Sequence, residues 1–540
     1  MELRLVYRIL RKVSDWTLET FYSEVYVDGA ENVPKTGPLI ITPCHHNELI
    51  DVATLAATIP HRRKVSFWAK STTFAVPVFG SILSSSGAIP VRRNPDKADA
   101  GASNAALFAA STAALARNQV IGVFPEGTSY TEPAIVQILS GAAWAALEFM
   151  RSQHVNGKTD SVAIIPVGIV YTNKSTFRSR VRVQYGTPID MASYVSASLF
   201  DTPDAEAERA VVKAVMKDVE AQLSEMTINA PDWETLYAAQ MARDMFHGSE
   251  RNVELKRWVS DGQWFIKLFS SPLTAEVPER ASLKRALTKY FSLLQYSNIT
   301  HAQLNDLSIH GRPGPLFIFR FLFIALRTLL NPSFLLFIPP FIAHMPAYLF
   351  AWLGSKLAPP GEEESQAQFK TILGGFGAGL GAGTSSFWIT KLMNPTPVRS
   401  KLVLWAVTAW FLMKWHWALV DGNYRRFGVL SAAYKLLLSA FQPRSWDLSP
   451  VELARYETPP APAANPFLKR KEGSTVLGGK AWLKVQPPPV PARRIISHLL
   501  LAREAAWEPL NGFIMNAKRA ETLPEKTGIE EIGGFRGDWC

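Results

Sequence analysis

Two short segments of this chain combine residue types that could carry out proton transfer and anion binding. His46 is followed by Asp51 in the pattern H-x4-D, and Pro125, Glu126 and Gly127 follow the apolar run Gln119–Phe124. A histidine paired with a carboxylate can act as a general base, because the carboxylate orients the imidazole and stabilises its protonated form. Such a base suits removal of the proton from an alcohol that attacks a thioester.

The elements around His46 decide whether this pair can form. The apolar run Pro38–Thr42 predicts a short buried strand, and the chain from Asn47 onward predicts a helix with Asn47 at its N-cap. Within a single helix, a five-residue offset separates two side chains by roughly 140°. His46 and Asp51 therefore meet only if His46 lies in the turn before the helix and Asp51 in its first turns.

Other interpretations of the same segment stay open. His45 competes for the role of base, but its spacing to Asp51 is x5. Cys44 could be a thiol nucleophile, although an alcohol can attack a thioester directly and needs no enzyme nucleophile. The histidine could also cap the helix or pack locally. We expect no metal site, since a zinc ion on the histidine and aspartate would lack a third protein ligand.

A basic pair stands at the end of a second expected strand. The run Ala88–Val91 predicts a strand that leads into Arg92 and Arg93, and Lys70, within Trp68–Ser71, is another expected phosphate partner. Two guanidinium groups suit a phosphate monoester, because arginine forms paired hydrogen bonds to such oxygens. The alternative is a solvated basic turn. The sequence thus offers a phosphate site at the edge of a sheet.

The Glu126 segment predicts a tight connection after a buried strand. Gly127 allows a positive φ or close backbone approach, and Glu126 could hold Arg93 in place or bind a substrate hydroxyl. The alternative is an ordinary turn. Further along the chain, Pro166 lies within the apolar run Ile164–Gly168, which predicts a strand whose proline sits at an edge or a bulge.

Taken in order, these segments resemble the phospholipid/glycerol acyltransferase family of the PlsC type. The resemblance rests on the H-x4-D pattern, on Gly87–Arg93 and on Phe124–Ser129. It implies an α/β fold with a mixed, mainly parallel sheet flanked by helices, and transfer of an acyl group without a cofactor or metal, with acyl-CoA as co-substrate. It implies catalysis by His46 and Asp51, acceptor binding by Arg93, Glu126 and Gly127, and a place for Pro166 in the acyl pocket. Four further residues are expected to bind substrate, namely Lys70, Gly87, Arg92 and Thr128.

A narrower resemblance concerns the acceptor. Residues 229–310 are similar to the helical extension of fungal-type glycerol-3-phosphate/dihydroxyacetone-phosphate acyltransferases. The chain departs from that group after Phe-Pro-Glu-Gly, where Thr128–Glu132 replaces its usual Gly-Ser-His-Asp-Arg, and this departure bears on the acceptor more than on the reaction. We expect acylation of glycerol-3-phosphate or dihydroxyacetone phosphate, with lysophosphatidate or another lysophospholipid as alternative acceptors. An inactive lipid-binding scaffold is the alternative outside enzymes.

Composition agrees with partners that carry negative charge. The 540 residues have a net charge of +11 and contain 2 cysteines, which exclude a disulfide scaffold. No nucleic-acid-binding module is recognisable. Acyl-CoA, a phosphorylated acceptor and the lipid bilayer are therefore the expected partners, and nucleic acid is not.

Hydropathy divides the chain into five expected parts. These are an amphipathic membrane-interface helix (1–25), an acyltransferase catalytic domain (26–228), a helical extension (229–312), a hydrophobic transmembrane region (313–421) and a Pro-rich, largely flexible cytosolic tail (422–540). The expected location is the endoplasmic reticulum membrane, with the lipid droplet as a second site and the catalytic domain facing the cytosol.

The transmembrane region contains four candidate spans, of which two to four cross the membrane. They are Leu316–Leu330, Phe334–Leu353, Thr371–Leu392 and Lys401–Val420. Pro339 and Pro340 predict a break or kink in the second candidate. Gly375, Gly379 and Gly383 predict close helix packing by the third. The acidic segment Glu362–Glu364 is expected on the lumenal side.

Overall fold

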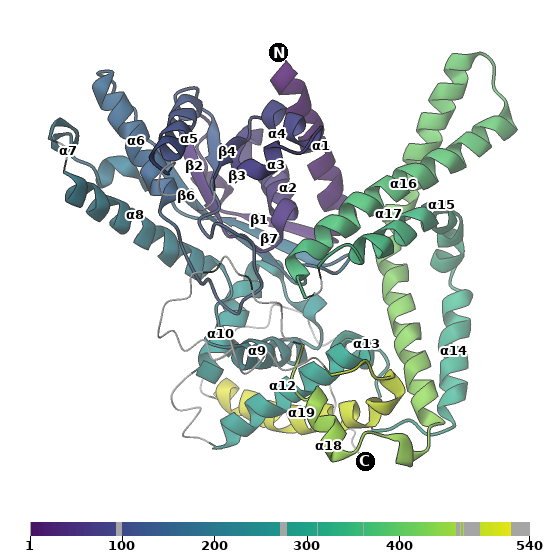
Figure 1. Cartoon of the computed structure of the whole chain (residues 1–540). Helices are drawn as coiled ribbons and strands as arrows, with labels where there is room; N and C mark the ends of the chain where they lie inside the picture. Colours follow the sequence, from purple (N-terminus) through teal and green to yellow (C-terminus); the bar gives the residue numbers. More distant parts are fainter. Residues whose placement is uncertain are drawn as a thin grey trace.

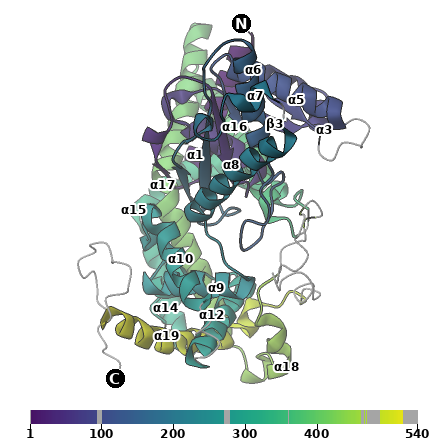
Figure 2. The same cartoon turned by 90° about the vertical axis from the view of Figure 1, so that its left-hand side faces the viewer.

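The computed structural model describes residues 2–92, 100–202, 204–270, 278–309, 311–359, 361–460, 465, 468 and 487–519. Arg93, the arginine expected to bind phosphate, lies outside these residues. In Figure 1 an N-terminal α/β unit lies above a group of shorter helices, and long helices on one side connect the two; Figure 2 shows the same parts turned by 90°.

One sheet forms the centre of the α/β unit, with strand order β1-β7-β6-β2-β5-β3-β4 and β8 paired to β6. Neighbouring strands are parallel except for β6 with β7 and β6 with β8. The predicted mixed, mainly parallel sheet is confirmed. The strands are β1 Glu24–Asp28, β2 Leu39–Pro43, β3 Val65–Lys70, β4 Ile89–Val91, β5 Val120–Gly122, β6 Ala163–Tyr171, β7 Arg180–Tyr185 and β8 Ile189–Asp190.

Helices flank this sheet because its central strands are apolar on both faces. Every residue of β2 and β5 is buried, as expected for parallel strands covered on two sides. The helix α8 begins after Asp204, whose side chain accepts the backbone N–H groups of Glu206 and Ala207. The helices of this unit are α1 Glu2–Phe21, α2 Glu48–Thr58, α3 Ser71–Phe74, α4 Phe79–Ser86, α5 Ala100–Leu115, α6 Gly141–Val155, α7 Ser198–Asp201 and α8 Ala205–Met226.

The N-terminal helix α1 has two apolar faces. Leu18 and Phe21 belong to the core of the α/β unit, and α1 packs on α2 and α4. Leu5, Ile9 and Trp16 on its other side are exposed. The helix is therefore a packed part of the domain that still presents apolar side chains outward, and its contact with a membrane stays a prediction.

A second hydrophobic core joins segments from the middle and the end of the chain. Leu287 and Tyr290 of the extension pack with Leu436, Leu499 and other residues of the last 120 positions. The expectation of a largely flexible tail from residue 422 is wrong for the described residues, because apolar side chains there bury themselves against the extension. The helices of this core are α9 Trp233–Phe246, α10 Trp258–Ser270, α12 Pro278–Ser297, α13 His301–Asp306, α18 Pro450–Leu453 and α19 Ile496–Arg519.

Four helices occupy the predicted transmembrane region. They are α14 Phe317–Leu329, α15 Pro332–Ser355, α16 Glu363–Met393 and α17 Val398–Ala440. By length and composition, α15 and α17 could each cross a membrane. The helix α15 continues through Pro339 and Pro340, so the chain is not broken there.

Glycines do bring α16 close to α15, but not the expected ones. A Cβ atom at Gly377 would lie 2.5 Å from the Pro346 carbonyl oxygen, and one at Gly381 would lie 2.1 Å from that of Ala343. A Cβ atom at Gly375 or Gly379 would have no neighbour within 4 Å among the described residues, whereas one at Gly383 would lie 3.6 Å from the Trp405 ring of α17. The packing face is therefore turned about the helix axis from the predicted one, since successive residues differ by about 100°.

The acidic segment lies against the α/β unit. Glu364 accepts a hydrogen bond from the Thr131 hydroxyl at 2.8 Å, and Glu363 accepts one from Ser175 at 3.0 Å. Two segments in direct contact cannot lie on opposite sides of a membrane. The expectation that Glu362–Glu364 and the catalytic domain are separated by the bilayer is therefore wrong.

Candidate active site

The predicted site segments meet at one edge of the sheet. Strands β6, β2, β5, β3 and β4 are neighbours in this order and run parallel, so their carboxyl ends share an edge. This edge carries, in the same order, the segments that begin at Thr172, Cys44, Val123, Ser71 and Arg92. Ligands of open α/β sheets bind at this edge.

Asp51 pairs with His45, where the x4 spacing predicted His46. The His45 Nδ1 atom lies 2.9 Å from Asp51 Oδ2. Helix α2 begins at Glu48, which puts Asp51 at its fourth position and both histidines in the preceding turn. The geometry of that turn directs the His45 ring, and not the His46 ring, to the carboxylate.

The Asp51 carboxylate is completely buried and held from several sides. Its Oδ2 atom also accepts the Asn47 backbone N–H at 2.7 Å, and its Oδ1 atom accepts the Tyr171 hydroxyl at 2.7 Å. Hydrogen bonds to a carboxylate stabilise its charged form. Asn47 occupies the predicted N-cap position, but its side chain bonds Tyr22 and the Lys174 carbonyl instead of the helix.

This arrangement sets the tautomer of His45. Because Asp51 is an acceptor, His45 Nδ1 carries the proton and Nε2 becomes the nitrogen that can take one. The ring is stacked on Phe124, with centroids 4.0 Å apart, and its side chain is 13% exposed. The imidazole is thus fixed in orientation and still accessible to a substrate.

His46 has a different environment. The backbone carbonyl of His46 accepts a hydrogen bond from Lys174 Nζ at 3.3 Å. Burial, aided by the nearby charge of Lys174, lowers the pKa of His46 to about 4. The His46 ring is therefore neutral at pH 7 and a weak base.

Glu126 supports the histidine loop from the neighbouring strand. Its Oε1 atom accepts the His45 backbone N–H at 2.6 Å, and its side chain is completely buried. Burial raises the pKa of Glu126 to about 8, although Tyr130 and the His45 N–H act in the opposite direction. The carboxyl group is therefore mostly protonated at pH 7.

The remaining residues of the Glu126 segment shape its turn. Gly127 has a φ of +72°, which favours glycine, and its N–H bonds the Phe124 carbonyl at 3.1 Å. Thr128 is buried, and its hydroxyl donates to the Ser129 carbonyl.

Pro166 lies inside the central strand β6, so the expectation of an edge strand or a bulge is wrong. It pairs with Thr42 of β2. On its other side the partner strand changes, from β8 at Ile164 to β7 at Val167. A proline is tolerated at this position because that side of the strand has no continuous ladder there.

The basic residues stand farther along the same edge. Lys70 ends β3 beside Val91 of β4, and Arg92 follows directly; both side chains are exposed. Three strand spacings separate β2 from β4, which is roughly 14 Å. Gly87 ends α4 with a φ of +86° and thereby turns the chain into β4.

Cys44 is not placed for nucleophilic chemistry. Its thiol is buried, donates to the Ile169 carbonyl at 3.3 Å and accepts the Ile169 N–H at 3.0 Å. Burial raises the pKa of this thiol well above its usual range. A nucleophilic cysteine needs a lowered pKa.

Sequence reasoning missed two contributors to this site. Tyr171 is 120 positions from the carboxylate that it holds, and Lys174 is 128 positions from the carbonyl that it contacts. No local pattern signals such contacts, because they depend on β6 lying beside β2. The sequence contains the x5 spacing between His45 and Asp51, but only the conformation of the turn shows that these two side chains are in contact.

Comparison with known proteins identifies the kind of domain that carries this site. Residues 24–170 match the protein family described as Acyltransferase. The match contains β2, β5 and all of β6 except its last residue, together with the His45–Asp51 pair. Residues 24–170 are therefore similar to acyltransferase domains.

The most similar curated relatives include two yeast enzymes. The chain is 33% identical to "Glycerol-3-phosphate O-acyltransferase 2" of Saccharomyces cerevisiae over 126 residues, 23% of this chain and 16% of the relative. It is 27% identical to "Glycerol-3-phosphate O-acyltransferase 1" of the same yeast over 238 residues, 42% of this chain and 29% of the relative. The chain thus spans less than a third of either relative.

Among solved structures, the chain is similar to the 1-acyl-sn-glycerophosphate (LPA) acyltransferase PlsC from Thermotoga maritima. The two are 18% identical, and the alignment covers 41% of this chain and 79% of that chain with a TM-score of 0.27.

Proposed function

We propose that this chain transfers a fatty acyl group from acyl-CoA to a hydroxyl group of glycerol-3-phosphate or dihydroxyacetone phosphate. The observation that carries the proposal is the hydrogen-bonded His45–Asp51 pair within residues that match the Acyltransferase family. The similarity to two yeast glycerol-3-phosphate O-acyltransferases supports this choice of acceptor.

His45 is the general base in this proposal, and Asp51 orients it. The Nε2 atom of His45 takes the proton of the acceptor hydroxyl while its oxygen attacks the thioester carbonyl carbon. When the tetrahedral intermediate collapses, the carbon–sulfur bond breaks and the CoA sulfur takes the proton from His45. His46 is the alternative base on its x4 spacing, but a pKa of about 4 makes it a poor proton acceptor at pH 7.

Basic residues at the sheet edge bind the phosphate of the acceptor. Lys70 and Arg92 supply positive charge there, and Arg93 follows in sequence. Replacing Arg93 with alanine should raise the acceptor KM and change the acyl-CoA KM less. An acceptor KM equal to that of the unmodified chain would contradict this role.

The enzyme acts at a membrane in this proposal. Its location is the endoplasmic reticulum, with the lipid droplet as a second site, and the catalytic domain faces the cytosol. The apolar helices α15 and α17 support membrane attachment. Membrane attachment fits the reaction, because its product keeps the acyl chain.

The test is acyl-CoA turnover by the purified chain in nanodiscs. Glycerol-3-phosphate, dihydroxyacetone phosphate and lysophosphatidate are offered separately, and Asp51→Asn is the control. Activity on either of the first two that Asp51→Asn removes would support the proposal. Activity on lysophosphatidate alone would assign the chain to the second acylation step, and the absence of Asp51-dependent activity on all three would favour a lipid-binding scaffold.

A further inference from the structure

A cavity of about 170 Å³ lies between the α/β unit and the helical extension. Tyr171 and Thr172 line it from the end of β6, and α9 and α10 supply most of the other residues. The hydroxyl of this same Tyr171 holds Asp51 at 2.7 Å. The cavity is thus next to the catalytic pair, but none of the predicted substrate-binding residues lines it.

Its lining follows the periodicity of two helices. Leu236, Ala239, Gln240 and Arg243 of α9 are spaced three, four and seven positions from the first and share one face. On α10, Trp258, Gly262 and Ile266 are spaced four apart in the same way. Both helices therefore turn a continuous face toward the cavity.

One cation is buried in this lining. Arg243 is 2% exposed, and its guanidinium lies over the Trp258 ring, 3.5 Å from the ring centroid. Its Nε and Nη2 atoms donate to Asp244 at 3.1 and 2.9 Å. Among the described residues Nη1 has no such acceptor, and it lies 3.8 Å from the position that a Cβ atom of Gly262 would take.

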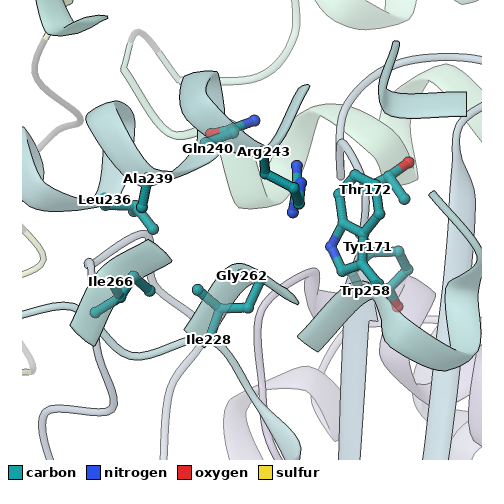
Figure 3. Close-up of a pocket in the computed structure, with 10 residues that line it drawn as sticks. All are labelled: Tyr171, Thr172, Ile228, Leu236, Ala239, Gln240, Arg243, Trp258, Gly262 and Ile266. Carbon is teal, nitrogen blue, oxygen red and sulfur yellow. The ribbon is translucent and has the colours of Figure 1, made fainter. Parts of the chain in front are cut away.

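The lining is divided into two parts. Figure 3 shows Arg243 pointing into the cavity, with Leu236, Ala239 and Ile266 on one side and Thr172 and Trp258 on the other. An arginine N–H favours a charged acceptor, while the aliphatic side chains favour an apolar group. The cavity is smaller than the roughly 300 Å³ at which pockets for drug-sized ligands begin.

We propose that this cavity binds an anionic amphiphile, with a carboxylate or phosphate head on Arg243 and a short aliphatic segment against Leu236 and Ile266. Inorganic phosphate would leave the apolar side empty, and an uncharged alcohol would leave the Arg243 N–H without a charged acceptor. A fatty carboxylate and a lipid phosphate share the required chemistry. The site is separate from the proposed reaction, because it does not use His45 or the basic residues of the sheet edge.

The test measures binding of radiolabelled hexanoate to the purified full-length chain in detergent, after subtraction of binding to protein-free micelles. Hexyl phosphate, hexanol and inorganic phosphate serve as competitors. We expect saturable hexanoate binding that hexyl phosphate displaces and that hexanol and inorganic phosphate do not. The stronger of the two anionic probes identifies the head group.

Two variants place the binding in this cavity. Gly262→Leu fills it with a side chain, and Gln240→Glu adds a carboxylate of nearly unchanged size beside Arg243. Each should weaken hexanoate binding by roughly tenfold or more, by steric exclusion or by repulsion. Gln240 is partly exposed, so its variant should fold even if Gly262→Leu does not, and circular dichroism checks both.

His45→Gln is the control that separates this site from the reaction. It should keep hexanoate binding, whether or not the chain proves to be an acyltransferase. The proposal is overturned if hexanoate binding is not saturable, if hexanol competes as well as hexyl phosphate, or if a folded Gln240→Glu variant binds as the unmodified chain does. Competition by glycerol-3-phosphate would also overturn it, because the cavity would then belong to the substrate site.

Discussion

The adjacent histidines allow one substitution to be compared at two positions. Glutamine at position 45 can still donate to Asp51 but cannot accept a proton, and the same change at position 46 is its matched control. Asp51 keeps its bonds from Asn47 and Tyr171 in either variant, so the loop should stay folded. Differences in activity then report on the chemistry.

A positioned general base contributes roughly 10²–10⁴-fold, which corresponds to about 3–5 kcal/mol of activation free energy. We therefore expect His45→Gln to lower kcat by that factor with KM values changed only a few fold. His46→Gln should lower kcat by less than about tenfold, because the loss of a neutral, half-buried ring affects packing only. The assay is acyl transfer to glycerol-3-phosphate in nanodiscs, with thermal unfolding of both variants measured in parallel.

The opposite order would refute the assignment. If His46→Gln removes activity and His45→Gln keeps it, the x4 spacing identifies the base and the observed contact with Asp51 does not. The pH dependence gives an independent check, because a base with the pKa of His46 would place the acidic limb of kcat/KM near pH 4.

Three further predictions concern stability and coupling. Burial raises the pKa of Glu126 to about 8, so the folded state holds a proton that the unfolded state loses above about pH 4.5. The free energy of unfolding should therefore fall by about 1.4 kcal/mol per pH unit between these values. Glu126→Gln should remove this fall when unfolding is measured against pH, and an unchanged pH dependence in the variant would show that the group is ionised in the folded state. Gly377→Ala should lower Tm because its Cβ would lie 2.5 Å from a backbone oxygen of α15, whereas Gly375→Ala has no such neighbour and should leave Tm nearly unchanged; equal shifts would contradict the packing of α16. The Thr131 hydroxyl accepts a hydrogen bond from Lys174 at 2.5 Å and donates one to Glu364 of α16. Thr131→Val should lower kcat severalfold, since a hydrogen bond contributes roughly 1 kcal/mol. Thr131→Ser should restore kcat if these hydrogen bonds, and not the methyl group, position the segment that contains Thr131.

Local patterns in the sequence were enough to predict the sheet and the segments of the site. The apolar run that ends at Thr42 forms β2, and the run before Glu126 forms β5. Because both strands are parallel, the residues that follow them reach the same edge. The blocks His46–Asp51 and Glu126–Gly127 are therefore close together, as their order in the chain indicated.

Side-chain direction and long-range packing could not be read from these patterns. Spacing selected His46, whereas the turn before α2 directs His45 to Asp51. Composition indicated a flexible tail, but α19 buries Leu499 and Leu510 in a core with α12. Which partner an apolar face finds depends on the whole chain.

The sequence by itself predicted an acyltransferase, because its three site segments in this order resemble those of the PlsC-type family. Only the tertiary structure decided which histidine is oriented, that Tyr171 supports the carboxylate, and that Arg243 is buried in the cavity that Tyr171 also lines. The physical reason is the separation along the chain over which each kind of interaction acts. Strand and helix signals act over a few residues, whereas these contacts join positions more than a hundred residues apart or depend on the rotation of one backbone turn.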